Sequence, residues 1–266
     1  PGHTPPGTTR VSVRGMVPVG DWLWVNSQEK PRWVNLQTGA AQPPTGCSPG
    51  FLLAAARDPR GDVWAVAGEA HRLSPDRTRC WTYPMASARN GNFGWALGTL
   101  ADGSFLVGHE QGLSLLDPAT GQNTPFVRYN GFGQLARSRV NAFLTDSARG
   151  GTWVAAASGL YWLDSRRGIT ARYAPDEPEP AHRLPFDHIL HLHADHQAPG
   201  TYWLATFGGG LLRWEPATGH ARQFTTRDGL PHDVVYCAYE DRFHRLWLST
   251  DYGIVCFNKE NAQTQV

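Results

Sequence analysis

The chain has 266 residues, a formal charge of +1 and no cluster of its 24 Lys and Arg residues, which excludes nucleic acid or an anionic membrane surface as the main partner, because both require concentrated positive charge. Apolar residues make up 41% of the sequence and include 11 Trp, enough to form a core and incompatible with a disordered chain. No apolar run approaches the roughly 20 residues that span a bilayer, and the first residues lack the apolar core of a signal peptide.

An aromatic residue recurs along the chain at intervals typical of repeat proteins. It stands at Trp24, Trp64, Phe105, Trp153, Trp203 and Trp247, with spacings of 40, 41, 48, 50 and 44 residues. Periods of about 40 to 50 residues indicate a propeller or a solenoid. Short apolar runs between Gly turns indicate strands, and helical periodicity is nearly absent. We therefore predict six repeats whose aromatic rings fill the space between neighbouring units.

The first repeat begins near Val11 and is the least regular, as terminal repeats tend to be. In later repeats an acid precedes the aromatic strand, followed closely by Gly in most of them. These acids are Asp58, Asp146, Asp195 and Asp241, and Asp102-Gly103 has the form of a shorter version of the same turn. An acidic side chain that accepts bonds from turn amides, with Gly at positive φ, is the ordinary chemistry of a hairpin turn. We expect these acids to serve the turns.

A third strand follows a Gly in most repeats, and an outer strand follows another turn, which gives four strands per unit. The third strands begin at Gly112, Gly159, Gly210 and Gly253. The Pro-rich, acidic stretch 173–182 is expected to be a loop between repeats because the pattern resumes unchanged at Leu184. The predicted fold is an all-β propeller of four-stranded antiparallel blades over residues 1–266, with six blades visible and six or seven when closed. We expect it to be one domain and a fragment of a longer protein.

The four cysteines, Cys47, Cys80, Cys237 and Cys256, show neither CxxC nor Cys/His zinc spacing. In an exported domain Cys47 and Cys80 could pair. Free thiols buried as small apolar groups are the alternative and the preferred interpretation, because it is the simpler one.

The last repeats also carry a family resemblance. The sequence GLPHDVVYCAYED from Gly229, followed by RLWLSTDYGIVCFN from Arg245, resembles the two-component regulator propeller repeat. Residues 184–214 match nearly as well, residues 146–164 moderately, and the first three units only at their aromatic and Gly positions. The sequence departs from the repeat pattern at Gly108 and Ala156, where Thr would stand, and at Arg183, where Gly would stand.

The resemblance implies a periplasmic sensor domain of a bacterial hybrid two-component or diguanylate-cyclase receptor. It implies a small-molecule ligand, often an oligosaccharide in this family, and downstream signalling domains of the same protein as partners. A homodimer is compatible with that role, and a membrane would be met only through segments absent from this chain. No nucleic-acid partner and no cofactor are expected.

In a propeller, the loops between blades and the loops between the second and third strands share one rim around the channel, where binding residues gather. The predicted ligand-binding residues on that rim are Arg137, Arg139, Arg183, Asp187, His188, Phe207, His232, Asp233, Asp251 and Tyr252. Glu110 and Gln111 belong to the same loop class. Arginine, acids and aromatic rings that converge on a channel suit a sugar through bidentate hydrogen bonds and stacking. For Asp187 and Asp233 a turn-capping role is the stronger expectation.

The histidine-rich stretch 188–196 is expected to pack at or line the channel. His191 and His193 share a face of a strand, but zinc needs three or four ligands and second-shell partners, so we predict no metal site. The sequence contains no Gly-x-Ser-x-Gly, P-loop or HExxH motif, so we predict no catalytic residues. A propeller enzyme, either a lyase or glycoside-active with His and acidic residues at the channel mouth, and a protein-binding scaffold are the alternatives.

Overall fold

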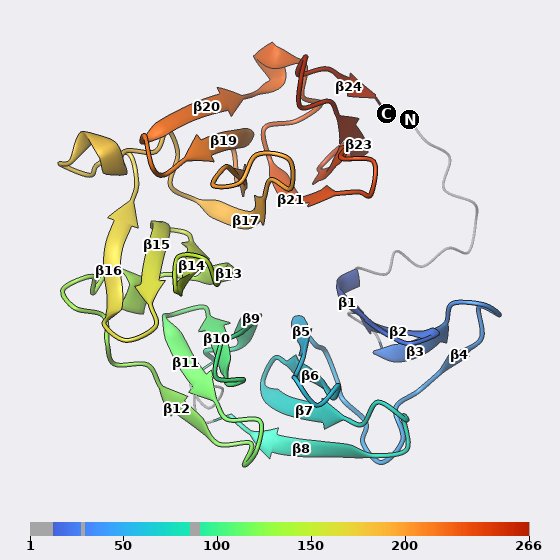
Figure 1. Cartoon of the computed structure of the whole chain (residues 1–266). Helices are drawn as coiled ribbons and strands as arrows, with labels where there is room; N and C mark the ends of the chain where they lie inside the picture. The colour runs from blue at the N-terminus through green and yellow to red at the C-terminus, as the bar shows by residue number, and fades with distance from the viewer. Residues whose placement is uncertain (1–12, 28–29, 86–90, 266) are drawn as a thin grey trace.

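The computed structural model describes residues 13–27, 30–85 and 91–265 of the chain. They form six four-stranded antiparallel sheets arranged as the blades of a propeller (Figure 1). In each sheet the strands follow one another in chain order, from the innermost strand to the outermost (Figure 1). The predicted fold class is therefore confirmed.

The blades are numbered 1 to 6 in chain order. Blades 1 to 3 consist of β1–β4 (Val13–Val19, Trp22–Ser27, Arg32–Asn35, Ala41–Gln42), β5–β8 (Ala54–Arg57, Val63–Val66, Glu69–Leu73, Cys80–Pro84) and β9–β12 (Gly94–Thr99, Phe105–His109, Leu113–Leu116, Asn123–Pro125). Blades 4 to 6 consist of β13–β16 (Val140–Asp146, Gly151–Ala156, Gly159–Asp164, Gly168–Tyr173), β17–β20 (Ile189–Ala194, Tyr202–Thr206, Leu211–Glu215, His220–Phe224) and β21–β24 (Val235–Glu240, Leu246–Thr250, Gly253–Phe257, Thr264–Gln265). Among the described residues, three short 3-10 helices lie in the connections between blades: η2 (Leu135–Arg137), η3 (Pro180–His182) and η4 (Thr226–Asp228).

Tryptophan rings fill most of the spaces between blades. Trp64, Trp153 and Trp203 are at most 2% exposed, and each projects from the second strand of its blade toward the next blade. The ring of Trp153 lies 5.1 Å from that of Trp214 in blade 5, and Trp203 lies 5.7 Å from Phe257 in blade 6. This packing confirms the predicted role of the repeated Trp as a core residue between blades.

The third repeat departs from the prediction. Phe105 does stand on the second strand, but its ring packs back on Trp64 of blade 2, at 6.0 Å. Side chains alternate between the two faces of a strand, so the residue that faces blade 4 is Leu106, which belongs to the cluster between blades 3 and 4. Leu106, not Phe105, is therefore the structural counterpart of the repeated Trp.

Three of the turn acids also accept a hydrogen bond from a Trp ring, whereas Asp146 accepts the Arg149 amide in its turn and the Tyr202 hydroxyl. In blade 2 the amides of Arg60 and Asp62 donate to Asp58 Oδ1, and the Trp64 indole donates to its Oδ2 at 3.2 Å. Asp195 and Asp241 accept the indoles of Trp203 and Trp247 in the same way, at 2.8 and 2.9 Å. The expected turn role is confirmed, and each of these three acids also supplies a partner to an indole N–H.

Asp102 is not the counterpart of these acids. The Gly103 amide donates to the Leu100 carbonyl at 3.0 Å, just as the Gly61 amide donates to the Asp58 carbonyl. Leu100 therefore occupies the turn position that carries Asp58 in blade 2. Each of the two stands six residues before the residue that faces the next blade, Leu106 and Trp64 respectively. Asp102 binds the Ser104 amide at 2.9 Å within its own turn.

Within the part of the chain that the structure describes, no other blade covers the outer face of blade 1 or of blade 6. Inner strands of successive blades contact one another from β1 to β21, but no comparable contact joins β21 to β1 within the described residues, and Figure 1 shows these two blades well apart. On the far face of blade 6, Trp247 is 37% exposed, and Tyr239 and Ile254 are exposed beside it. Met16 is exposed on blade 1. Trp247 thus lacks the cover that Trp203 receives.

A disulfide joins Cys47, in the connection between β4 and β5, to Cys80 on β8. The preference for free thiols was wrong for this pair. Cys237 and Cys256 are free and half-buried. A pairing between residues distant in sequence is decided by three-dimensional proximity, which the spacing of cysteines does not reveal.

We expect loss of this disulfide to lower the free energy of unfolding by about 2–4 kcal/mol, because a bridge across 33 residues restricts the unfolded chain. Urea denaturation of the oxidised protein and of a Cys47→Ser/Cys80→Ser variant measures the difference. A reductant should destabilise the wild type but leave this double variant unchanged. Equal stability of the oxidised wild type and the double variant would contradict the prediction.

Candidate functional site

A pocket of about 500 Å³ opens on the predicted rim, over blades 3 to 5. It is lined by Glu110, Gln111, Gln134, Arg137, Ser138, Arg139, Ala157, Ser158 and His188. These residues belong to loops between second and third strands and to connections between blades, the two loop classes that the sequence pointed to. The structure therefore brings together three of the predicted ligand-binding residues, Arg137, Arg139 and His188, with Glu110 and Gln111.

Arg139 occupies a central position in this pocket. Its Nε donates to Asn141 Oδ1 at 3.0 Å, and its guanidinium carbon lies 5.3 Å from the centre of the Trp95 ring. Asn141 in turn donates to the Ile189 carbonyl at 2.7 Å, which ties blade 4 to blade 5. Because the Nε bond and the ring orient the guanidinium, its remaining N–H groups are directed toward the pocket and His188.

His188 connects Arg139 to an exposed aromatic ring. Arg139 Nη2 lies 3.4 Å from His188 Nε2, and the His188 ring centre lies 5.1 Å from that of Phe207. Burial first, and then the neighbouring Arg139 charge, lower the pKa of His188 below its ordinary value. A neutral imidazole accepts a hydrogen bond through one ring nitrogen and donates through the other. Because an arginine N–H only donates, His188 Nε2 accepts from Arg139, which leaves the Nδ1–H to donate to a ligand hydroxyl.

A second group of predicted residues lies on the loops of blade 6. His232 Nδ1 is 3.5 Å from Asp251 Oδ2, and the His232 ring centre is 5.4 Å from that of Tyr252, which is 73% exposed. The Tyr236 hydroxyl donates to Asp251 Oδ1 at 2.8 Å. A β-bridge between Phe207 and Val234 joins this group to the first, so the two groups form one continuous part of the rim.

Three predicted residues make hydrogen bonds that stabilise their own loop or the loop beside it. Arg183 donates to the carbonyls of Glu177 and Pro178, at 2.8 and 3.2 Å, within the connection to blade 5. Asp233 accepts the Thr226 amide at 2.7 Å through its side chain and the Gly210 amide through its carbonyl. The Asp187 carbonyl accepts the Ile189 amide at 2.8 Å. For Asp233 the expected turn role is thus visible in its bonds.

Trp95 and Asn141 were not identified from the sequence. Both lie on inner strands, Trp95 on β9 and Asn141 on β13, whereas the prediction considered loops only. A Trp at the start of a predicted strand was the available signal. Trp95 is outside the set of repeated aromatic residues, and this distinguishes it from the Trp residues of the core.

The histidines of the stretch 188–196 have different surroundings: one is largely buried, and two others belong to an ion-pair cluster. Burial and the neighbouring His193 lower the pKa of His191 to about 4. His193, His196 and Glu240 bring one ligand-type atom each within 4.8 Å of one another. The Lys259 ammonium also bonds Glu240 Oε1, at 3.1 Å, and Asp195 Oδ1, at 2.9 Å. A cation of the chain itself therefore balances this carboxylate, which makes the cluster an ion pair between blades 5 and 6.

The chemistry of the rim suits a polyhydroxylated ligand. Arg137 and Arg139 provide forked N–H donors, His188 can donate through its Nδ1–H, and Glu110 can accept. Phe207 is 48% exposed beside them and offers an apolar face of the kind on which sugar rings stack. These residues therefore form a surface of hydrogen-bonding groups next to an exposed aromatic ring.

Comparisons with known proteins agree with this architecture. A family model described as "Two component regulator propeller" matches residues 229–252, across the turn into β21 and through β22. No curated protein matches the chain.

Several solved structures resemble the fold. The extracellular domain of a putative hybrid two component system from B. thetaiotaomicron is 16% identical with a TM-score of 0.67, covering 96% of this chain and 40% of that one. PorZ, a surface component of the type-IX secretion system of Porphyromonas gingivalis, is 17% identical with a TM-score of 0.70, covering 94% and 39%. Virginiamycin B lyase from Staphylococcus aureus is 12% identical with a TM-score of 0.69, covering 95% and 83%.

These identities are low enough that the likeness shows the propeller fold alone. The chain spans about two-fifths of the receptor domain and of PorZ. Within the described residues, no helix has the length and apolarity needed to cross a membrane.

Proposed function

From the two-component regulator propeller repeat that this chain carries on a six-bladed propeller, we propose that it is the extracytoplasmic, non-catalytic sensor propeller of a bacterial signalling receptor. The proposed ligand is an oligosaccharide or a similar polyhydroxylated small molecule. The observation that carries this proposal is the rim pocket in which Arg137, Arg139 and His188 converge. Its predominantly polar hydrogen-bonding groups and adjacent aromatic rings match the needs of such a ligand.

The Cys47–Cys80 disulfide supports the extracytoplasmic placement. Disulfides form and persist in oxidising compartments, such as the bacterial periplasm, and are rare in the reduced cytosol. The receptor-domain neighbour, which is itself an extracellular domain, agrees with this. Expression with export to the periplasm should yield a fully oxidised pair, whereas a thiol that remains free after export would count against the placement.

The uncovered faces of blades 1 and 6 support the proposal that the intact receptor contains more of the ring. Tyr239, Trp247 and Ile254 present an apolar surface on blade 6, and blade faces elsewhere in the molecule are covered by the next sheet. We propose that one further four-stranded blade packs between blades 6 and 1. In a polypeptide extended by its flanking sequence, the fluorescence of Trp247 should become that of a buried indole.

We expect Arg139→Ala to weaken oligosaccharide binding at least tenfold, because a charge-assisted bond to a ligand contributes about 1.5–3 kcal/mol. Calorimetric titration with a panel of oligosaccharides measures the affinity. The control is Arg222→Ala, an exposed arginine on the outer strand β20. Neither change should alter the melting temperature appreciably.

Two results would contradict the proposal. Equal affinity of the wild type and Arg139→Ala would move the ligand site away from this pocket. Release of product from any panel member would favour an enzyme instead, the alternative raised by the lyase with the same fold. Binding of a protein, with no response to any sugar, would favour the scaffold alternative.

A further inference from the structure

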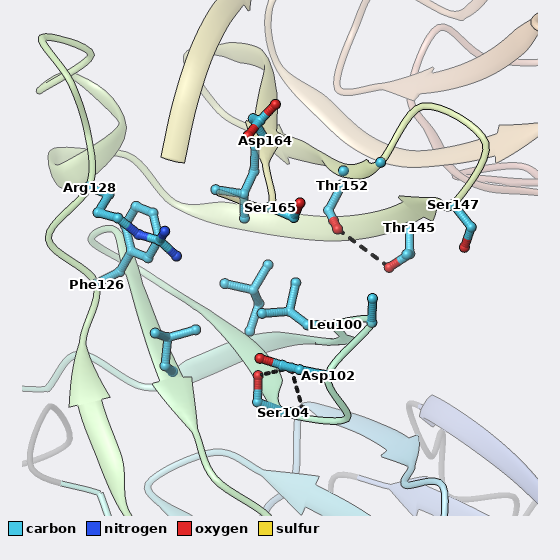
Figure 2. Close-up of a pocket in the computed structure, with 16 residues that line it drawn as sticks. Leu100, Asp102, Ser104, Phe126, Arg128, Thr145, Ser147, Thr152, Asp164 and Ser165 are labelled. Carbon is cyan, nitrogen blue, oxygen red and sulfur yellow. Dashed lines mark hydrogen bonds between the residues drawn. The ribbon is translucent and has the colours of Figure 1, made fainter. Parts of the chain in front are cut away.

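A second pocket lies between blades 3 and 4, on the rim opposite the candidate ligand site (Figure 2). Its volume is about 370 Å³, within the range of about 300–1,000 Å³ typical of small-molecule sites. It lies among the hairpin turns that join first to second strands and third to fourth strands, at 100–104, 147–151 and 164–165. It is thus separate from the loops that form the sensor site.

The pocket coincides with the place where the repeated Trp is missing. Leu106 lines it and stands where Trp64, Trp153 and Trp203 stand in their blades. Each of those rings fills the space toward the next blade and is at most 2% exposed. Leucine is much smaller than tryptophan, so the space between blades 3 and 4 lacks an indole ring.

Blade 4 compensates for the smaller Leu106 only in part. The Phe143 side chain packs against Gly98, the strand partner of Leu106, but the residue pair of blade 4 at the pocket is small. The residues that face Trp153 from blade 5 are the aromatic pair Tyr202 and Trp214. The corresponding register pair in blade 4 is Thr152 and Leu163, and both line the pocket. The aromatic cluster between blades 4 and 5 therefore has smaller counterparts between blades 3 and 4, both on blade 3 and on blade 4.

The anchor for an indole N–H is also absent. The turn position that carries Asp58, the acceptor for Trp64, carries Leu100 in blade 3. Leu100 lines the pocket together with Leu106. The Asp58–Trp64 pair of blade 2 thus corresponds to two leucines in blade 3. This end of the pocket is therefore apolar and has no charged group that a ligand would need to neutralise.

Phe126 and Leu115 complete the apolar wall. The hydroxyls of Thr145 and Thr152 lie next to each other, on the side of the pocket away from Phe126 (Figure 2). Thr145 Oγ1 donates to the Thr99 carbonyl at 2.8 Å and lies 3.5 Å from Thr152 Oγ1. The charged groups at the mouth are engaged locally. Asp164 accepts the Arg166 and Arg167 amides, and Arg128 donates to the Arg166 carbonyl at 2.9 Å.

We propose that this pocket binds a neutral aromatic molecule with a ring system of about the size of indole, seated between blades 3 and 4 where other blades carry their own Trp. The apolar wall would cover the faces of the ring, and the threonine hydroxyls would meet one polar group at its edge. This site is independent of the proposed sugar site, so either can fail without the other.

The test uses indole itself as the probe. We expect ligand-observed NMR and calorimetry to detect binding to the wild type, and a rise in melting temperature with indole concentration, because a ligand of the native state stabilises it. Leu106→Trp places the missing ring in the pocket and should weaken indole binding at least tenfold. Leu36→Trp is the matched control, since Leu36 is 55% exposed on blade 1, and it should bind indole as the wild type does.

Leu100→Asp provides a second variant in case Leu106→Trp does not fold. Aspartate is already accommodated at this turn position in blades 2 and 6, and in blade 3 it would place a carboxylate in the apolar wall, so indole binding should again fall at least tenfold. Absence of binding to the wild type up to the solubility limit of indole would overturn the proposal. So would unchanged affinity in whichever of the two variants folds.

Discussion

Trp203→Ala is expected to lower the free energy of unfolding by about 3–5 kcal/mol, the range for removing a fully buried aromatic side chain. Trp203 is completely buried between blades 5 and 6, in contact with Phe224 and Phe257. The change also removes the indole donor of Asp195. Urea denaturation followed by circular dichroism measures the loss.

Trp247→Ala provides the matched comparison, because Trp247 is the counterpart of Trp203 one blade later. It keeps the bond to the turn acid, here Asp241, but its ring is 37% exposed on the uncovered face of blade 6. We expect a loss of about 1–2 kcal/mol, clearly smaller than for Trp203, because part of the ring is already exposed and its removal leaves open surface and no enclosed cavity. Equal losses for the two variants would mean that another surface covers blade 6 in solution.

Lys259→Met is expected to destabilise the protein by about 3–5 kcal/mol at neutral pH. The Lys259 side chain is only 10% exposed and joins Asp195 and Glu240, which are 5% and 0% exposed. Removing one partner of a buried ion pair leaves uncompensated charge, and this is costly even where the intact pair adds little. The control is Lys259→Arg, which keeps the positive charge and should recover much of the stability.

The pH dependence follows from the same cluster. Burial alone would raise the pKa of Glu240, but bonds from the His196 amide, His244 and Lys259 outweigh it and lower this pKa. The pKa of Asp195 is lowered likewise, against its burial, by bonds from Trp203 and Lys259. A carboxyl with a depressed native pKa stabilises the fold above its unfolded pKa of about 4, and this contribution is lost as the pH falls through the native pKa.

Without Lys259 we expect both native pKa values to rise, because the bonds from His196, His244 and Trp203 remain but the neighbouring ammonium charge is lost. Where a native pKa rises above its unfolded value, the variant gains stability relative to neutral pH as it takes up a proton, by up to about 1.4 kcal/mol per pH unit for each proton. The denaturation curves of wild type and Lys259→Met should therefore converge between pH 7 and pH 5. If the difference in free energy of unfolding between the two proteins stayed constant over that range, the remaining hydrogen bonds would be sufficient to keep both carboxyls ionised.

The rim site could be predicted only in part. Loop class identified Arg137, Arg139 and His188, because the strand order of a propeller blade fixes which loops share a rim. It could not identify Trp95 and Asn141, which orient Arg139 from inner strands. It also included Arg183, whose bonds stay within its own loop. The type of loop predicts on which rim a residue lies. The direction of its side chain depends on local hydrogen bonds, which the type of loop does not predict.

The sequence by itself determined the repeat, its strands and the placement of Trp between blades, because these depend on spacing and on the alternation of side chains within short segments. The tertiary structure decided the rest. The shift from Phe105 to Leu106 is a matter of which face of β10 each side chain occupies, and one residue of register moves a ring to the other side of a sheet. The Cys47–Cys80 pair, the Lys259 cluster and the exposure of Trp247 each depend on segments far apart in sequence. Such contacts, and their absence, are set by how the blades pack against one another, which a local pattern does not contain.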